Sequence, residues 1–240
     1  MKYAIVTGSI KGIGKEIAVK LLERGVYVIM NYSSDDQTAS EIKTEFRERF
    51  QDRYTIIKAN LSCANQVREL VEKTKKISRS IDYIIFSAGA TAKAEFGEYT
   101  YEEWLKVFDV NLNMPFMMLQ MFDKLVNEEG RIIFISSVMS VYPHSSSIPY
   151  AVSKAAVNNL VQNMTKYYGE RRITINSVIT GFTNTTMINR TKEHIESINN
   201  KIALHRFAEA EEVANFVIHI IENGYINGAL LEITGGYSFR

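Results

Sequence analysis

Disulfide-forming cysteines, long apolar runs and an excess of either charge are all missing from this 240-residue sequence. Its single cysteine, Cys63, cannot form an intramolecular disulfide, which excludes a small disulfide-held secreted scaffold and leads us to expect a cytoplasmic protein. No apolar run approaches the ~20 residues of a membrane-spanning helix, so we expect no membrane partner. The 28 basic and 27 acidic side chains leave a net charge of +1, which gives no electrostatic attraction to nucleic acid.

Metal-ligand and hydrolase motifs are missing as well. The four histidines, His144, His194, His205 and His219, are scattered, and none shows the paired spacing of a metal site, so we expect no metal. Ser137 and His144 lie close in sequence, but the G-x-S-x-G turn of many serine hydrolases does not occur. A Ser/His hydrolase is therefore disfavoured.

What is present is a regular alternation of short apolar runs and amphipathic segments. The apolar runs predict strands at residues 3–6, 26–30, 54–57, 83–86, 132–135, 173–179 and 229–233. The segments between them predict helices at residues 13–22, 38–50, 67–77, 104–126, 150–168 and 213–221. Most strand runs are apolar on both faces, as in a parallel sheet covered by helices. The sequence thus predicts a single domain over residues 1–240, an α/β Rossmann-type doubly wound parallel sheet of about seven strands with helices on both faces.

Residues 181–205 interrupt the alternation. A Thr/Asn-rich stretch is followed there by polar residues with helical character, and we expect no strand in it. Because a long excursion of this kind in a compact domain is typical of a binding loop, we predict a substrate lid at about residues 182–206.

The first predicted strand ends in a glycine-rich turn that opens the first predicted helix. The turn reads Gly8-Ser9-Ile10-Lys11-Gly12-Ile13-Gly14. Glycines at a strand-to-helix turn let the backbone approach a diphosphate closely, so that the helix N-terminus can bind it. The alternative is an ordinary strand-to-helix turn, but the strand before it and the helix after it favour a dinucleotide site.

The end of the second strand indicates which dinucleotide binds. An NAD site usually carries an acidic residue there, whereas this strand ends in Met30-Asn31-Tyr32-Ser33-Ser34, and no acidic residue occurs before Asp35. Hydroxyls and an amide, with the cation of Lys11 from the glycine turn, suit the 2′-phosphate of NADP. We therefore predict NADP(H) rather than NAD(H).

The spacing Tyr-x-x-x-Lys occurs twice, as Tyr54/Lys58 and Tyr150/Lys154, so the spacing alone proves nothing. The first pair spans a predicted strand, where four residues cover ~13 Å and the two side chains cannot cooperate. Tyr150 and Lys154 begin a predicted helix, where they share one face a turn apart. A neighbouring ammonium would lower the pKa of the phenol, which makes Tyr150 a candidate general acid/base.

Two further polar residues are candidates for a functional role. Ser137 ends the fifth strand at the edge where such sheets bind ligands, and its hydroxyl could donate to a substrate carbonyl oxygen. Asn111 lies inside a predicted helix although asparagine is a poor helix former, so its side chain either points to solvent or has a polar role inside the protein.

Taken together, these residues resemble the short-chain dehydrogenase/reductases, and most of all the 3-oxoacyl-carrier-protein reductases. The resemblance covers essentially the whole chain. It rests on Thr7-Gly8-x-x-x-Gly12-x-Gly14, Ala88-Gly89, Asn111, Ser137, Tyr150-x-x-x-Lys154 and Asn176-x-Val178, with further similarity at Gly181-Phe182-x-x-Thr185, Arg206-Phe207, Ile226-Asn227-Gly228 and Gly235-Gly236-Tyr237.

The resemblance implies an NADPH-dependent oxidoreductase that reduces a ketone to a secondary alcohol. Tyr150 would protonate the carbonyl oxygen, Lys154 would lower the Tyr150 pKa and hold the nicotinamide ribose, Ser137 would orient the substrate, and Asn111 would support a water chain. The cofactor contacts that it implies, together with the glycine turn and the second strand, are Gly8, Ser9, Lys11, Gly12, Ile13, Gly14, Asn31, Tyr32, Ser33, Asn60, Leu61, Ser87, Ala88, Gly89, Tyr150, Lys154, Thr180, Gly181, Thr183 and Thr185.

The implied partners are a small-molecule carbonyl substrate, such as a 3-oxoacyl thioester, and a second copy of the chain. Members of the family assemble as dimers or tetramers through two long helices, here residues 104–126 and 150–168. The acidic residues Glu128 and Glu129 would repel an acidic acyl carrier protein, although Arg171 and Arg172 could partly offset them, so a carrier protein stays an open alternative.

A different class of function remains to be weighed, a non-catalytic sensor that binds NADP(H) without turnover. The retention of Asn111, Ser137, Tyr150 and Lys154 together speaks against a sensor, because a sensor needs none of the proton chemistry.

Overall fold

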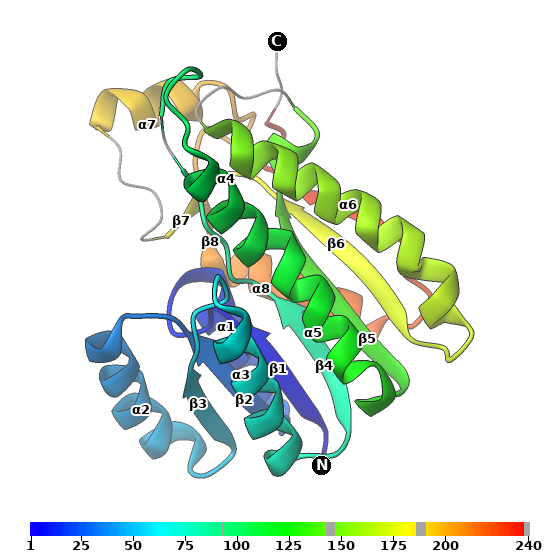
Figure 1. The fold of residues 1–240 in the computed structure, drawn as a ribbon. Coiled ribbons are helices and arrows are strands. Elements are labelled where there is room, and N and C mark those ends of the chain that lie inside the picture. Colours follow the sequence, from blue (N-terminus) through cyan, green and yellow to red (C-terminus); the bar gives the residue numbers. More distant parts are fainter. Residues whose placement is uncertain (93, 143–146, 186–190, 238–240) are drawn as a thin grey trace.

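Seven parallel strands form one twisted sheet in the order β3-β2-β1-β4-β5-β6-β9 (Figure 1). The strands are β1 (Tyr3–Thr7), β2 (Tyr27–Tyr32), β3 (Tyr54–Lys58), β4 (Ile81–Phe86), β5 (Val126–Ser137), β6 (Thr174–Thr180) and β9 (Leu230–Ile233). The computed structural model describes residues 1–92, 94–142, 147–185 and 191–237. The order reverses direction between β1 and β4, which opens a crevice at the carboxyl ends of these two strands.

Helices cover both faces of the sheet because most strand residues are apolar on both sides. On one face α1 (Gly12–Glu23), α2 (Asp36–Phe50) and α8 (Ala210–Glu222) pack against the strands through one buried cluster. On the other face α3 (Ala64–Ile77), α5 (Met114–Phe122) and α6 (Ile148–Gly169) pack through a second cluster. The predicted doubly wound α/β fold in a single domain is confirmed, and no helix in the described ranges is long and apolar enough to cross a membrane.

The predicted helix at residues 104–126 is wrong as a single element. The chain forms α4 (Tyr101–Phe108), a π-turn (η1, Asp109–Asn113), α5, and a short 3-10 turn (η2, Asp123–Leu125) before β5 begins at Val126. Pro115 at the start of α5 has no N–H to continue the helical hydrogen bonds, and Asn111 is turned inward within the π-turn. Side-chain contacts therefore override the local helical pattern.

The segment predicted as a lid contains a short strand that we did not expect. Its two residues, β7 (Thr183–Asn184), pair in parallel with β8 (Ala208–Glu209), and two residues are too few to give a periodic signal. Helix α7 (Lys192–Asn199) follows, and residues 186–190 lie outside the described residues. Ile198 of α7 packs with Phe182, Phe207 and Val138 in a small third cluster, which joins this segment to the turn after β5.

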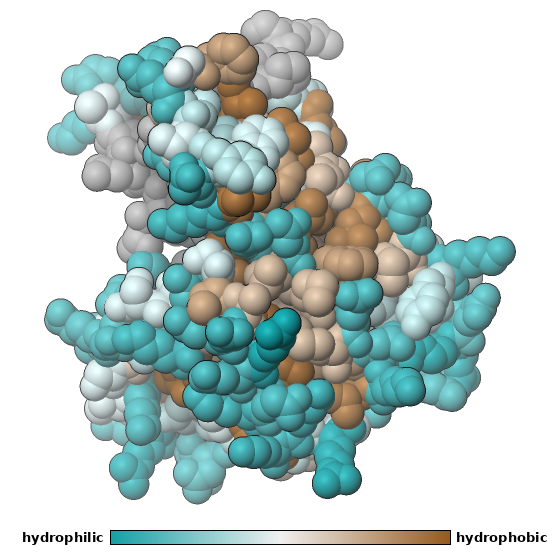
Figure 2. Space-filling model, viewed as in Figure 1, coloured by the Kyte–Doolittle hydropathy of each residue, from teal (hydrophilic) through white to brown (hydrophobic). Residues whose placement is uncertain are grey.

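Large apolar side chains also remain exposed on the surface of α4, α5 and α6. They are Tyr101, Leu105, Met117, Val152 and Tyr167. Figure 2 shows apolar surface in the middle of the face that these helices form.

Candidate active site

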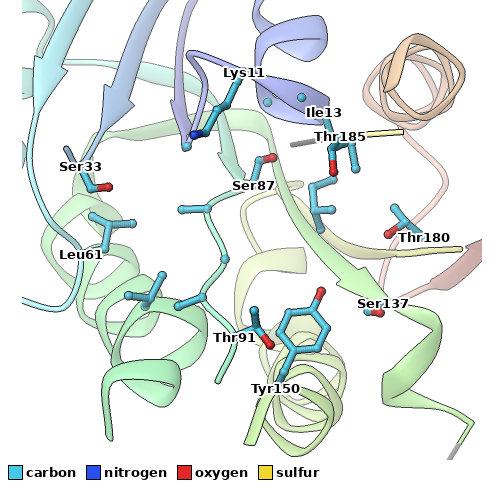
Figure 3. Close-up of a pocket in the computed structure, with 18 of the residues that line it drawn as sticks. Lys11, Ile13, Ser33, Leu61, Ser87, Thr91, Ser137, Tyr150, Thr180 and Thr185 are labelled. Carbon is cyan, nitrogen blue, oxygen red and sulfur yellow. The ribbon is translucent and has the colours of Figure 1, made fainter. Parts of the chain in front are cut away.

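A cavity of about 540 Å³ lies along the carboxyl edge of the sheet, between the glycine turn and the first turn of α6 (Figure 3). This volume is within the range of small-molecule and cofactor sites. The predicted cofactor contacts on its wall are Gly8, Lys11, Gly12, Ile13, Gly14, Asn31, Tyr32, Ser33, Asn60, Leu61, Ser87, Ala88, Gly89, Thr180, Gly181, Thr183 and Thr185. Ser137, Tyr150 and Lys154 line the same cavity. The fold thus brings the two predicted sites together.

The glycine turn places the N-terminus of α1 at the cavity wall. Lys11 precedes the helix but makes no side-chain capping hydrogen bond, and the first helical turn carries no acidic residue. The first backbone N–H groups of the helix are therefore left for an anion. A Cβ at Gly14 would lie 2.4 Å from the carbonyl oxygen of Gly8, so only glycine lets the turn pass this close to the helix. The turn fits the diphosphate of a dinucleotide.

Lys11 extends from the turn toward the end of β2, on the side where Ser33 lies (Figure 3). Its Nζ atom is 3.4 Å from Oδ2 of Asp35 in an exposed ion pair. The other oxygen of Asp35 accepts a hydrogen bond from the backbone N–H of Thr38, and these contacts lower the pKa of the Asp35 carboxyl, the Thr38 bond most. The cation that we predicted for a 2′-phosphate is in place, but a carboxylate that we did not predict as its partner competes for it.

The side chains of Ser9 and Asn31, two of the predicted cofactor contacts, form hydrogen bonds inside the protein. Ser9 is fully buried; its hydroxyl donates to the carbonyl oxygen of Val6 at 2.8 Å and accepts from the backbone N–H of Asn31. The side-chain amide of Asn31 donates to the carbonyl oxygens of Ile57 and Ala59, at 3.4 and 3.0 Å. The two side chains therefore brace the turn against β2 and β3, while Asn31 also lines the cavity, and contact of these two residues with the cofactor stays a prediction.

Tyr150 projects from the first turn of α6 into the cavity, with Ser137 beside it at the end of β5 (Figure 3). Burial raises the pKa of the Tyr150 phenol, and a hydrogen bond with Ser137 lowers it by less. We expected Lys154 to lower this pKa, but burial dominates and the net direction is upward. The phenol is therefore protonated at neutral pH, which is the form that a proton donor needs.

Lys154 lies beside the ring of Tyr150 rather than at its hydroxyl. Its Nζ atom is 5.7 Å from the ring centroid and donates to the carbonyl oxygen of Ile135 at 2.7 Å. The side chain is 4% exposed, and burial lowers its pKa to about 8. Lys154 thus keeps its positive charge at neutral pH in a buried position at the floor of the cavity.

Asn111 does not line the cavity but supports its wall. Its Oδ1 atom accepts from the backbone N–H of Ala90 at 2.8 Å, and its Nδ2 atom donates to the carbonyl oxygen of Ala90 and to the hydroxyl of Ser153. Of the two alternatives that the sequence left open, the structure shows the interior one, because Asn111 is 2% exposed. The residue ties the loop after β4 to α6.

The comparison with known families decides the assignment. The model of the short chain dehydrogenase family matches residues 2–196, which is most of the chain. The chain belongs to the short-chain dehydrogenase/reductase family.

Curated members of this oxidoreductase family resemble the chain over almost its full length. A 3-oxoacyl-[acyl-carrier-protein] reductase of Staphylococcus aureus is 29% identical over 240 residues, covering 98% of this chain and 97% of that protein. A 3alpha-hydroxysteroid dehydrogenase of Mediterraneibacter gnavus is 30% identical, covering 98% and 96%. The resemblance to 3-oxoacyl reductases is thus confirmed, and a relative with a different substrate is equally similar.

Solved structures of short-chain dehydrogenases share the whole fold. A short-chain dehydrogenase/reductase from Serratia marcescens superposes with a TM-score of 0.93 at 28% identity, covering 99% of this chain and 98% of that one. A short chain dehydrogenase from Burkholderia cenocepacia, solved in complex with NADP, superposes with a TM-score of 0.92 at 27% identity, covering 98% and 97%.

Several residues line the cavity although we did not predict them from the sequence. Ser147 is 3% exposed; its hydroxyl accepts from the hydroxyl of Thr91 and donates to the carbonyl oxygen of Ala92, which closes the cavity beside Tyr150. Met139 and Phe182 add apolar surface. Their types carry no local signal, but Ser147 precedes Tyr150 by less than one helical turn, so its position could have indicated it.

His144, which we considered with Ser137 for a hydrolase, lies outside the described residues. Among residues 1–92, 94–142, 147–185 and 191–237, no group of three or more His, Cys, Asp or Glu side chains is arranged to hold a metal. Cys63 is half-buried at the start of α3 and unpaired by disulfide.

Proposed function

We propose that the protein is an NADPH-dependent reductase that converts a ketone to a secondary alcohol. The observation that carries the proposal is the convergence of Tyr150, Ser137 and Lys154 on the cavity whose other end is the uncapped N-terminus of α1. When bound there, the reduced nicotinamide supplies a hydride to the carbonyl carbon.

The residues of the chain supply the proton and the orientation. The carbonyl oxygen would accept hydrogen bonds from the hydroxyls of Tyr150 and Ser137, and the Tyr150 proton would move to it as negative charge develops. The raised pKa of Tyr150 keeps this proton available at neutral pH. The charged Lys154 beside the ring would stabilise the phenolate that is left, and Asn111 would support the path by which a new proton arrives.

The choice of NADPH rests on the end of β2 and on the neighbours. Lys11 and the hydroxyl of Ser33 face the position of a 2′-phosphate, and in the described chain the nearest carboxylate there, Asp35, is already paired with Lys11. A Pseudomonas aeruginosa structure that is 26% identical and superposes with a TM-score of 0.89 is an NADP complex, as is the Burkholderia protein.

For the substrate, we propose a small free ketone or thioester rather than one carried by an acidic protein. Arg172 forms ion pairs with Glu128 at 2.8 Å and with Glu129 at 3.2 Å. Arg171 pairs with Asp123 at 2.6 Å. The arginines that could have attracted an acidic carrier are therefore neutralised by the chain's own carboxylates.

A lid and an oligomer complete the proposal. Phe182, Thr183 and Thr185 line the cavity at the start of the segment 182–206, which we propose as the lid over the substrate. The exposed apolar side chains of α4, α5 and α6 (Figure 2) are the surface through which we propose that two or four copies assemble. Sedimentation of the purified protein tests the assembly, because a monomer at micromolar concentration would refute it.

The test of the function is a panel of ketones assayed by loss of NADPH or NADH absorbance, with the variant Tyr150→Phe. We expect turnover with NADPH, and a loss of about 10²- to 10⁴-fold in kcat for the variant, with NADPH affinity nearly unchanged. Unchanged turnover in the variant would refute Tyr150 as the proton donor. Tight NADPH binding without turnover of any ketone would refute the reductase and favour the sensor.

A further inference from the structure

A chain of partly buried hydrogen bonds adjoins Ser137, formed by residues that do not line the cavity. The hydroxyl of Ser140 donates to the carbonyl oxygen of Ser137 at 2.5 Å. The side-chain amide of Asn158 donates to that Ser140 hydroxyl at 2.8 Å, and the hydroxyl of Ser177 donates to Oδ1 of Asn158 at 2.7 Å. The chain therefore connects β6 through α6 to the turn that follows β5.

Asn158 occupies the central place in this chain because of its position on α6. It lies one helical turn beyond Lys154 and two beyond Tyr150, so the three side chains share the face of α6 that meets β5. Asn158 is 6% exposed and Ser177 is fully buried. Buried amides are in most cases hydrogen-bonded, and both the donor and the acceptor of the Asn158 amide are paired here.

The direction of each hydrogen bond fixes what Ser140 does. Its oxygen accepts from Asn158 and lies 3.3 Å from the hydroxyl of Ser136, so its single proton is left to donate to the Ser137 carbonyl. This holds the 3-10 turn η3 (Val138–Ser140) against the end of β5.

The same turn sets the hydroxyl of Ser137. The backbone N–H of Met139, in the middle of η3, donates to Ser137 Oγ at 3.2 Å. With that oxygen already accepting a bond, the hydroxyl proton of Ser137 is free to point into the cavity toward Tyr150 and a substrate carbonyl. The position of η3 therefore decides the direction of the Ser137 proton.

We propose that Asn158 is a positioning residue, which acts through Ser140 and η3 to aim the Ser137 hydroxyl at the substrate carbonyl. This inference rests on the proposed reductase function. Asn158 does not line the cavity, so it would influence the reaction only through Ser137.

The test is a double-mutant cycle with four proteins: the native chain, Asn158→Leu, Ser137→Ala and the combination of both. Leucine has the same branched shape as asparagine, although it is larger, and it cannot donate to Ser140. We expect Asn158→Leu to lower kcat by about 10-fold, as for the loss of one well-aimed hydrogen bond in the transition state, with NADPH affinity changed less than about twofold. On the Ser137→Ala background the same substitution should cause no further loss.

A purely structural role would give a different pattern. If Asn158 only stabilised the fold, its replacement would lower kcat by the same factor with or without Ser137, and that result would overturn the proposal. The matched control is Asn159→Leu, because Asn159 is the adjacent residue on the exposed face of α6 and its side chain is hydrogen-bonded to Asn163. The control should leave kcat unchanged.

A readout without turnover separates this proposal from the reductase function. The ultraviolet absorbance of each protein is titrated against pH, and the curve of its Tyr150→Phe counterpart is subtracted. The difference reports the ionisation of the Tyr150 phenol alone. The charged groups on the same cavity wall are Lys11, Asp35, Lys106 and Lys154. Since the hydrogen bond with Ser137 lowers this pKa, Asn158→Leu should raise it, and should not raise it further once Ser137 is replaced. Additive shifts would overturn the proposal even if no ketone is reduced.

The hydrogen bond between Asn158 and Ser140 can also be removed by changing Ser140. Should Asn158→Leu fail to fold, Ser140→Ala removes the same link with a smaller change. It should reproduce the loss in kcat and the dependence on Ser137, and an unchanged kcat in a folded Ser140→Ala protein would refute the proposed route.

Discussion

Replacing Lys154 with methionine should stabilise the protein at neutral pH while stopping its chemistry. Lys154 is 4% exposed, and burial lowers its pKa from 10.5 to about 8. At 1.36 kcal/mol per pH unit, the buried ammonium costs the folded state about 3 kcal/mol below pH 8. Methionine keeps the length of the side chain without the charge.

Part of this gain is offset by a lost contact. The Nζ atom of Lys154 donates to the carbonyl oxygen of Ile135 at 2.7 Å, and the variant leaves that carbonyl one partner short. Such a loss costs about 1–2 kcal/mol. We therefore expect a net gain of about 1–2 kcal/mol in the free energy of unfolding at pH 7, or a Tm higher by roughly 2–8 °C for a chain of this size.

The pH dependence gives the sign of the effect. Between pH 8 and 10.5 the unfolded chain holds the Lys154 proton more tightly than the folded protein does, so the stability of the native protein rises with pH across this window. The advantage of Lys154→Met should therefore shrink as the pH rises from 8 toward 10.5. Below pH 8 it should be constant, since both states are then protonated.

Thermal unfolding without nucleotide, followed at pH 7 and near pH 10, measures both effects. The control is Lys166→Met, which replaces an exposed lysine of the same helix and should change stability by less than about 0.5 kcal/mol. A Lys154→Met protein that is less stable at pH 7, or one whose Tm difference does not change with pH, would refute the reasoning. The same preparation should show no ketone reduction.

Three further predictions follow from single contacts. Asp35→Asn keeps the N-cap of α2 but removes the ion pair with Lys11. NADPH should then bind about 2- to 5-fold more tightly in a fluorescence titration, while the affinity for NADH stays constant. Equal gains for both nucleotides would contradict the assigned role of Lys11. Gly14→Ala places a Cβ 2.4 Å from the Gly8 carbonyl oxygen, so the Tm and NADPH affinity should both fall sharply, and a protein with native affinity would disprove the close approach. Asn111→Leu removes the hydrogen bonds to the backbone N–H and carbonyl groups of Ala90. The free energy of unfolding, measured in urea, should fall by about 2–4 kcal/mol. An unchanged urea midpoint would show that Asn111 is dispensable for stability.

The sequence by itself determined the order of the elements and the place of the site. Strand runs that are apolar on both faces, such as residues 83–86, can be stable only between two layers of helices, so the doubly wound sheet was predictable from composition along the chain. The glycine turn and the pair Tyr150/Lys154 were predictable for a similar reason. Each lies within a few residues of a strand end or a helix start, where local spacing controls geometry.

Only the tertiary structure decided how the side chains are used. The inward turn of Asn111 depends on Ala90 and Ser153, and the pairing of Lys11 with Asp35 depends on two loops that meet at the sheet edge. The raised pKa of the Tyr150 phenol likewise comes from burial in the folded protein. These contacts join residues that are distant in sequence, and their strength depends on exclusion of water, which no local pattern of residues encodes.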